Sequence, residues 1–241
     1  MRQGGLAVVL LLSACSKESF PGRAAAEVVP VRPSQVLDFE VLYANNCAGC
    51  HGPAGRTGAS VELADPVYLA FADDAVLRRV TANGTPGTSM PAFAQSAGGT
   101  LTEAQVDALV RGIRARWAKP EALGGASHPP YAAAGPGDPA AGARAYAVFC
   151  ARCHGEDGRG GRAASSIVDA TYLALVSEQH LRTSVLVGRP GLGAPDWRSD
   201  VPARPMTAED VSDVVAWLTS HRVAFPGQPY PVGRVSAGAL P

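Results

Sequence analysis

The sequence predicts an all-α protein built from two copies of one unit, and two observations support this fold class. The first is an internal repeat. At an offset of 104 residues the chain matches itself at several positions in order, among them Asp65 with Asp169, Leu69 with Leu173, and Arg78 with Arg182. The second is that each copy closes with a stretch whose apolar residues recur every three or four positions, as on one face of an α-helix. Such a repeat means that both halves share one fold.

The composition is that of a globular protein. Of the 241 residues, 46% are hydrophobic and 17% are charged, and 21 basic residues balance 21 acidic ones. Nucleic-acid binding requires a strong excess of positive charge, so we expect no nucleic-acid partner. The length suits one or two domains.

Residues 1–14 are typical of a targeting segment. Arg2 carries a positive charge, and residues 6–12 form an apolar run that is shorter than the roughly 20 residues a membrane-spanning helix needs. The run ends in Ser13-Ala14-Cys15, which resembles a bacterial lipoprotein signal. The resemblance implies a lipid anchor on Cys15, export to the periplasmic side of a membrane, and residues 15–33 as a tether. The alternative is an ordinary signal peptide in which Cys15 is incidental.

Four of the five cysteines form two C-x-x-C pairs, and a histidine follows each pair directly. The motifs are CAGCH at 47–51 and CARCH at 150–154. C-x-x-C-H is the pattern of covalent haem attachment. Two thiols one helical turn apart can form thioethers with the haem vinyl groups, and the histidine then lies beneath the iron. A single C-x-x-C could also be a redox dithiol or half a zinc site, but two such motifs in an exported chain make both of these remote. We predict two haem c groups, attached through Cys47, Cys50, Cys150 and Cys153, with His51 and His154 as iron ligands.

Stretches rich in proline, glycine and alanine flank the two copies. Residues 119–137, KPEALGGASHPPYAAAGPG, are expected to form a semi-extended linker rather than a regular element. Residues 223–241 are similar in composition and are expected to form a tail. The predicted domains therefore cover residues 34–118 and 138–222.

Each copy is expected to end in an amphipathic helix that begins with a capping box. Thr102 precedes Gln105 by three residues in the first copy, and Thr207 precedes Asp210 by the same spacing in the second. These helices align at an offset of 105, so one residue was gained in the loop before the second helix. The two apolar stripes are Val106, Leu109, Val110 and Ile113, and Val211, Val214, Val215 and Leu218.

In order and in content these motifs resemble a class I cytochrome c domain. Such a domain has a helix leading into C-x-x-C-H, a loop, a methionine-bearing loop and a C-terminal helix that crosses the first. The mature chain resembles a dihaem cytochrome c with two such domains in tandem. The resemblance covers residues 34–222 and implies that each domain is a few helices around one covalently bound haem.

A contact that is usual in this family predicts the helix crossing. A glycine eight residues before the first cysteine lets an aromatic residue of the last helix pack closely, and the second copy has Gly142 and Trp217 at these places. The first copy has Phe39 in the place of the glycine and Gly112 in the place of the aromatic residue, an exchange that conserves the volume of the contact. We expect the same crossing in both halves. The alternative is an exposed Phe39.

The sixth iron ligand is expected to differ between the copies. By resemblance, Met90 in GTPGTSMPAF at 84–93 is the ligand opposite His51, but the matching stretch GRPGLGAPDW at 188–197 has Ala194 instead. The predicted ligand of the second iron is Met206, which aligns with Leu101 and could instead make only a hydrophobic staple. Without Met206, the second iron would be open or water-bound, or would take a nitrogen ligand from His128, His180 or His221.

Four arginines, Arg78, Arg152, Arg182 and Arg189, are expected to be surface charges. The alternative for Arg182 and Arg189 is an ion pair with a haem propionate.

The leading expectation for function is electron transfer. Two covalent haems near a membrane would pass single electrons between respiratory-chain partners, which are membrane complexes or soluble carriers, alone or within a larger complex. The alternative is a haem enzyme or small-ligand binder with an open iron at His154. We expect an electron carrier and not an enzyme.

Overall fold

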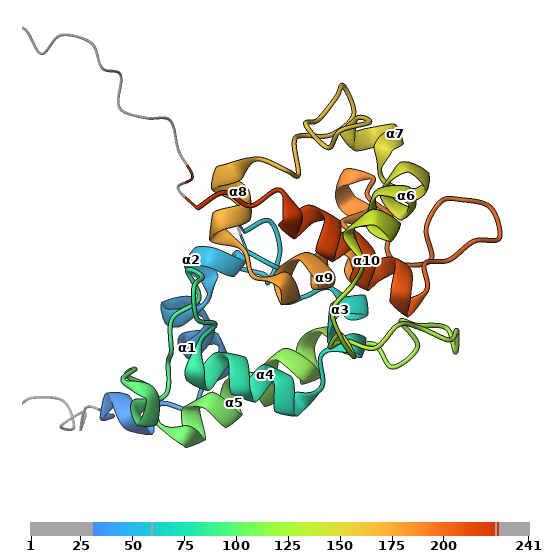
Figure 1. Ribbon diagram of the computed structural model, residues 1–241. Helices are drawn as coiled ribbons and strands as arrows, with labels where there is room; N and C mark the ends of the chain where they lie inside the picture. The colour runs from blue at the N-terminus through green and yellow to red at the C-terminus, as the bar shows by residue number, and fades with distance from the viewer. Residues whose placement is uncertain (1–30, 59, 225, 227–241) are drawn as a thin grey trace, which may run out of the picture. The chain divides into compact units, whose positions relative to one another are not determined.

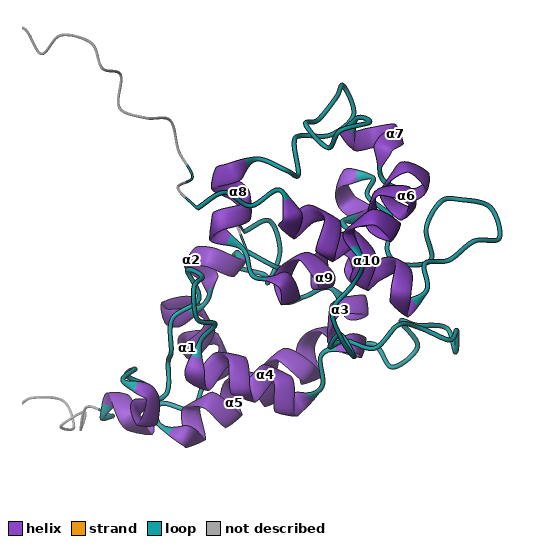
Figure 2. Cartoon of the chain, viewed as in Figure 1, coloured by secondary structure: helices purple, strands orange, loops and turns teal. Residues whose placement is uncertain are grey.

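The computed structural model describes residues 31–58, 60–224 and 226 (Figure 1). The predicted targeting segment, the lipidation site Cys15 and most of the predicted tether and tail lie outside these residues. Described residues from Ser34 onward belong to one compact unit. In the described part the chain forms helices, turns and isolated bridges but no strand (Figure 2), which confirms the prediction of an all-α fold.

The helices of the first repeat, residues 34–118, follow the expected order (Figure 1). A helix leads into the C-x-x-C-H motif, a short helix carries the motif, two helices follow and a long helix closes the repeat. These are α1 (Phe39–Asn46), α2 (Ala48–His51), α3 (Pro66–Phe71), α4 (Asp74–Asn83) and α5 (Glu103–Trp117), with 3-10 turns at Pro33–Gln35 and Gln95–Ala97.

The second repeat, residues 138–222, has the same succession of helices. They are α6 (Pro139–Phe149), α7 (Ala151–His154), α8 (Ala170–Leu175), α9 (Glu178–Val187) and α10 (Ala208–Ser220), with a 3-10 turn at Pro190–Leu192. The same order of elements in both halves is the tandem class I cytochrome c arrangement that the sequence predicts.

Side-chain caps set the starts of the last helices. The Thr102 hydroxyl accepts a hydrogen bond from the backbone of Gln105 at 3.3 Å, and the Gln105 side chain accepts one from the backbone of Thr102 at 3.0 Å. Thr207 and Asp210 make the same reciprocal pair at 3.1 and 3.0 Å. Both capping boxes therefore form as predicted, and each satisfies two backbone groups that a helix start leaves unpaired.

The first and last helices of each repeat cross at the predicted contact. A Cβ on Gly112 of α5 would overlap the ring of Phe39 on α1, so the large side chain and the small one have exchanged helices. A Cβ on Gly142 of α6 would lie 2.8 Å from the Cβ of Trp217 and would overlap the backbone oxygen of Asp213, both on α10. The exchange predicted from the sequence is confirmed, and an exposed Phe39 is excluded because its ring packs against α5.

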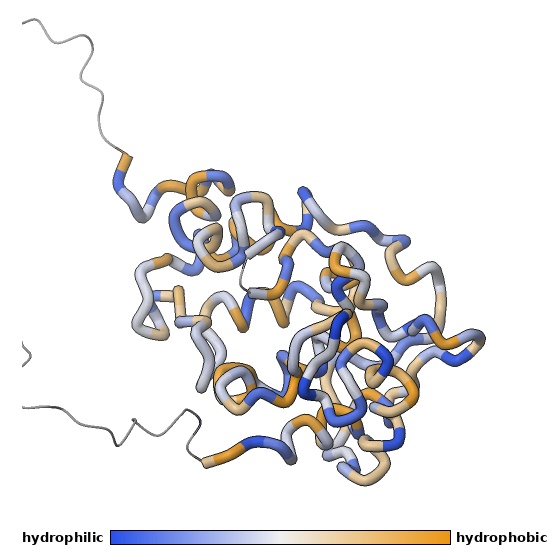
Figure 3. Tube along the Cα trace, turned by 90° about the horizontal axis from the view of Figure 1, so that it is seen from above, coloured by the Kyte–Doolittle hydropathy of each residue, from blue (hydrophilic) through white to orange (hydrophobic). Residues whose placement is uncertain are grey.

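Apolar and polar residues alternate along the helical turns, as Figure 3 shows by hydropathy. The predicted stripe of α5 is buried at all four of its positions, and so is that of α10. The stripes therefore face the core, as amphipathic helices of a globular protein do.

Candidate haem sites

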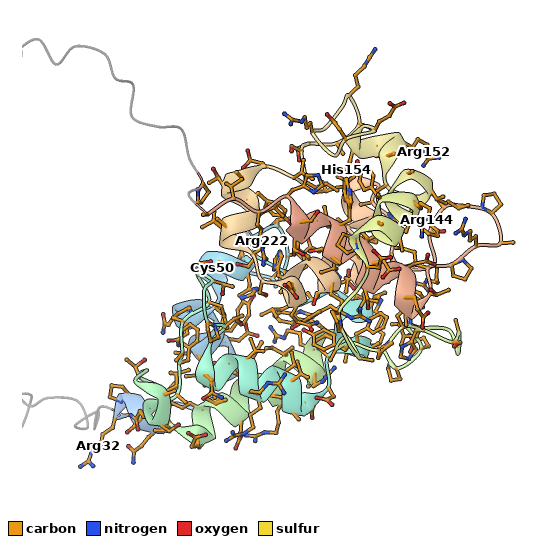
Figure 4. The ribbon with its side chains drawn as sticks, in the orientation of Figure 1. Arg32, Cys50, Arg144, Arg152, His154 and Arg222 are labelled. Atoms are coloured by element: carbon orange, nitrogen blue, oxygen red, sulfur yellow. The ribbon has the colours of Figure 1, made fainter. Side chains whose placement is uncertain are left out.

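The first candidate site lies where α1 ends and α2 begins. Cys47 caps the C-terminus of α1, and the one-turn helix α2 carries Cys50 and His51. The backbone N–H of His51 donates to the carbonyl of Cys47 at 2.9 Å, so one helical turn holds the motif together. Cys50 is exposed and is labelled in Figure 4. The second candidate site repeats this arrangement, with Cys150 capping α6, and Cys153 and His154 on α7.

Burial controls the chemistry of the first thiol in each motif. Burial, and then the neighbouring Cys50, raise the pKa of the Cys47 thiol to about 12. Burial and Cys153 likewise raise the pKa of the Cys150 thiol to about 12. Before any covalent attachment, both thiols are therefore protonated at neutral pH.

The histidine of each motif is held by a backbone carbonyl of the following loop. The Nδ1 atom of His51 lies 2.8 Å from the carbonyl oxygen of Val61, and Nδ1 of His154 lies 2.9 Å from that of Ser165. A carbonyl oxygen can only accept, so Nδ1 carries the proton in both rings and Nε2 keeps its lone pair. This is the arrangement by which proteins orient a metal-binding imidazole.

The two histidines differ in their exposure to solvent. His51 is buried, with 7% of its surface exposed, whereas His154, which Figure 4 labels, is partly exposed. Burial lowers the pKa of His51, which favours the neutral imidazole that metal ligation requires.

A tyrosine four residues before the first cysteine holds each motif through a hydrogen bond to the glycine that follows the histidine. The hydroxyl of Tyr43 donates to the carbonyl of Gly52 at 2.8 Å, and that of Tyr146 donates to the carbonyl of Gly155. Each ring also packs against an aromatic residue of the last helix, since Tyr43 contacts Trp117 edge-on and Tyr146 stacks on Trp217. Sequence reasoning missed this pair, although the equal spacing of the two tyrosines was a usable signal.

The loop predicted to bear the sixth ligand has the same backbone pairing in both repeats. The N–H of Thr85 donates to the carbonyl of Met90 at 3.0 Å, and the N–H of Arg189 donates to that of Ala194 at 2.9 Å. Each pair is related by the repeat offset of 104 residues. Ala194 therefore occupies the structural place of Met90, and the second repeat has no sulfur at this position.

Met206 occupies the structural place of Leu101. Its N–H donates to the carbonyl of Trp197 at 2.8 Å, and the N–H of Leu101 donates to the equivalent carbonyl of Phe93 at 2.7 Å. The exposed fractions are 6% for Met206 and 5% for Leu101, and both belong to the apolar core. Because leucine fills this position in the first repeat, packing alone accounts for the burial of Met206. Its ligation of iron stays a prediction.

The predicted surface arginines are not all at the surface. Arg78 and Arg152 are partly or largely exposed and pair with acidic side chains, and Arg189 is exposed. For Arg182 the prediction of a surface charge is wrong. Only 2% of its surface is exposed, because its guanidinium hydrogen-bonds backbone carbonyls of the linker.

The three remaining histidines lie in different surroundings. His128 packs against Phe71 with ring centroids 5.0 Å apart, and Nδ1 of His221 lies 2.8 Å from the carbonyl of Trp217 at the end of α10. Burial, and then Arg189, lower the pKa of the partly buried His180. Over the described residues, no group of three or more histidine, cysteine and acidic side chains is placed to hold a metal ion.

The chemistry of both motifs fits a covalently bound haem. Each brings two thiols onto one helical turn and adds an imidazole whose Nδ1 is tied to a carbonyl, which leaves Nε2 for the iron. A helical domain of this order with such a motif defines the class of c-type cytochromes.

Within that class, the chain belongs to the family described as cytochrome C oxidase, cbb3-type, subunit III, whose model matches residues 34–111 and 137–218. Binding of haem c and a role in electron transfer follow from this membership. A similar protein is the cbb3-type cytochrome c oxidase subunit CcoP of Azospirillum sp. (strain B510), which is 31% identical over 133 residues. The match covers 51% of this chain and 40% of that relative, so the chain spans well under two thirds of the relative's length.

Among solved structures, similarity extends to the Kuenenia stuttgartiensis reducing HAO-like protein complex Kustc0457/Kustc0458. That match has 18% identity and a TM-score of 0.43, and covers 76% of this chain and 95% of the other. A second match is dihydro-heme d1 dehydrogenase NirN in complex with DHE, with 32% identity, a TM-score of 0.27, and coverage of 39% of this chain and 18% of the other. None of the helices in the described ranges has the length and hydropathy of a membrane span.

Proposed function

We propose that this protein is a membrane-anchored dihaem cytochrome c that passes single electrons between respiratory-chain partners. The observation that carries the proposal is the repeated histidine geometry, in which His51 and His154 each donate from Nδ1 to a loop carbonyl, at 2.8 and 2.9 Å. Two equal sites of this kind support two haems in one chain. We propose a carrier rather than an enzyme.

The chain's own residues would hold and tune the two groups. Cys47 and Cys50 would attach the first haem, and Cys150 and Cys153 the second. His51 and His154 would bind iron through Nε2, while the carbonyls of Val61 and Ser165 hold the proton on Nδ1 and fix the plane of each ring. Haem supplies a reversible one-electron change at its iron. The protein needs to supply only the covalent attachment of the haem, the ligands of its iron and apolar side chains that shield it from water.

The sixth ligands would come from different places in the two repeats, and this difference in position would make the two haems unequal. A methionine thioether favours ferrous iron and raises the reduction potential. Met90 supplies this ligand in the first repeat, and we propose Met206 for the second, where Ala194 cannot serve. Unequal potentials would give electrons a preferred direction along the chain.

We further propose that the protein acts as a subunit of a respiratory complex. The similar protein from Azospirillum is a subunit of a cbb3-type oxidase, and this likeness supports an oxidase as partner. The lipoprotein-type sequence before Cys15 supports a lipid anchor on the periplasmic side. A lipid-anchored carrier would stay close to membrane-bound redox partners.

The second candidate function is ligand binding or catalysis at an open iron in the second repeat. It is favoured by one observation. Ala194 stands in the place of Met90, and Met206 stands in the place of Leu101, so packing explains the burial of Met206, the one methionine of the second repeat, without ligation.

Carbon monoxide binding to the reduced holoprotein separates the two candidates. If Met206 is a ligand, neither haem of the wild-type protein binds carbon monoxide, and its visible spectrum does not change. The variant Met206→Leu then exposes one iron, and half of the haem absorbance shifts. The variant Met90→Leu is the matched control, and exposes the other iron. A shift of half the haem in the wild-type protein would instead establish an open second iron and overturn the assignment of Met206.

A further inference from the structure

Arg182 is a buried cation without a buried counter-charge. It lies on α9, and no carboxylate among the described residues comes within ion-pair distance of it. Burial lowers its pKa. Its guanidinium is satisfied by neutral oxygens instead. Nη2 donates to the carbonyl of Pro130 at 2.8 Å, Nε donates to that of Tyr131 at 3.0 Å, and Nη1 donates to the hydroxyl of Ser212 at 3.0 Å.

The equivalent arginine of the first repeat has a different environment. Arg78 is 43% exposed and forms ion pairs at 2.7 Å with Asp107 and with Glu103, both on α5. The residues at the places of these acids in α10, at the offset of 105, are Ser212 and Ala208. The second repeat has therefore kept the arginine and lost both acids, and carbonyls of the linker accept its hydrogen bonds.

A second side chain of α9 holds the same linker residue. The Nε2 atom of Gln179 donates to the carbonyl of Tyr131 at 3.0 Å. The position of Gln179 is occupied by Ala75 in the first repeat, so this contact also belongs to the second repeat alone. Two side chains, one turn apart on α9, thus converge on the backbone of Pro130 and Tyr131.

The linker is held on the side of the first repeat as well. The side chain of Tyr131 lies close to the side chain of Tyr68, a buried residue of α3, and the two interact. Three residues before it, His128 packs edge-on against Phe71 at the end of α3. Phe71 also packs edge-on against Trp197, with ring centroids 5.2 Å apart. The linker therefore contacts both repeats over the few residues that Arg182 binds.

We propose that Arg182, assisted by Gln179, clamps the linker and so fixes the two haem-binding repeats in one arrangement. Arg182 is then a positioning residue for electron transfer between the two haems. Moving the linker away would take from the guanidinium its carbonyl acceptors at Pro130 and Tyr131 and leave it the hydroxyl of Ser212. Losing these acceptors is costly, so the clamp favours the arrangement in which the linker contacts both repeats. This inference rests on the proposed function for its consequence, since it concerns transfer between two haems. The clamp itself does not depend on that function.

The test compares Arg182→Gln with Arg78→Gln in the full-length holoprotein. Two quantities are measured, the rate at which a protease cuts the linker at 119–137 and the rate of electron transfer between the haems after rapid partial reduction. Arg182→Gln is expected to speed linker cleavage at least about tenfold, the change that losing one charge-assisted hydrogen bond implies. It is also expected to slow transfer between the haems severalfold. Arg78→Gln leaves both rates unchanged.

Two milder variants decide the matter if Arg182→Gln does not fold. Gln179→Ala and Tyr131→Phe each remove one contact of the linker and leave the arginine in place, and both should speed cleavage by a smaller factor. Cleavage and transfer rates equal to those of the wild-type protein in all three variants would overturn the clamp. If the haems exchange no electrons even in the wild-type protein, the proposed function fails, but linker cleavage still tests the clamp.

Discussion

At the scale of single residues, backbone carbonyls do much of the positioning in this protein. The carbonyls of Val61 and Ser165 orient the two haem-motif histidines. The C-x-x-C-H motifs predict which imidazoles matter, because residue type and spacing carry that information. They cannot predict the acceptors, since a carbonyl belongs to every residue and only the path of the loop selects one.

The sequence also does not predict that two arginines make equivalent contacts from positions that do not align. Arg114 donates to the carbonyls of Leu69 and Ala72, and Arg222 donates to the equivalent carbonyls of Leu173 and Val176. At the offset that aligns the last helices, however, Arg114 matches Thr219, so the two arginines lie three residues out of register. Alignment of the repeats cannot reveal an equivalence that only the reach of a long side chain creates.

We predict that Arg114→Ala lowers the free energy of unfolding by about 1–3 kcal/mol, because two carbonyls lose a charged donor. The matched control is Arg111→Ala on the same helix, whose side chain is exposed. It should change stability by less than about 0.5 kcal/mol. Denaturant unfolding of the holoprotein measures both. Equal effects of the two substitutions would show that the contacts of Arg114 contribute nothing.

At the scale of elements, the sequence predicts most of what the structure shows. The last helices, their capping boxes and the exchange of Phe39 and Gly112 all follow from patterns with a direct physical cause. Apolar spacing marks the buried face of a helix, and a conserved contact volume ties two helices together. These rules hold because each depends on residue type and spacing, which the sequence states directly.

The helix crossings predict unequal effects of two similar substitutions. In Gly142→Ala the new methyl group meets the backbone of α10 at Asp213, which cannot move without shifting the helix. In Gly112→Ala it meets the side chain of Phe39, which can shift without moving a helix backbone. Gly142→Ala should therefore destabilise the protein by about 3 kcal/mol, the upper end of the usual cost of overpacking, and Gly112→Ala by about 1 kcal/mol.

Gly135→Ala is the control for both, since a Cβ there meets no atom within 4 Å. Denaturant midpoints of the three variants supply the comparison. A larger loss for Gly112→Ala than for Gly142→Ala would contradict the account of the crossing.

At the scale of the whole molecule, the sequence predicts the two repeats better than it predicts the contacts of the linker between them. Residues 119–137 read as a linker, and the described structure has turns and no helix there. Its attachment through Arg182 was not predicted, because the arginine aligns with the exposed Arg78 and only the loss of two acids on another helix distinguishes them. A buried charge satisfied by distant carbonyls leaves no periodic pattern in the sequence.

The asymmetry of the two repeats leads to a prediction for the whole holoprotein. A redox titration should resolve two one-electron steps, because the ligand loops differ at Met90 and Ala194. The step at higher potential should belong to the first repeat, whose methionine lies in the regular place for a ligand that favours ferrous iron. Met90→Leu should therefore lower the upper step and leave the lower one in place, while Met206→Leu should change only the lower step. If Met206→Leu moved the upper step instead, the proposed direction of electron flow would be reversed.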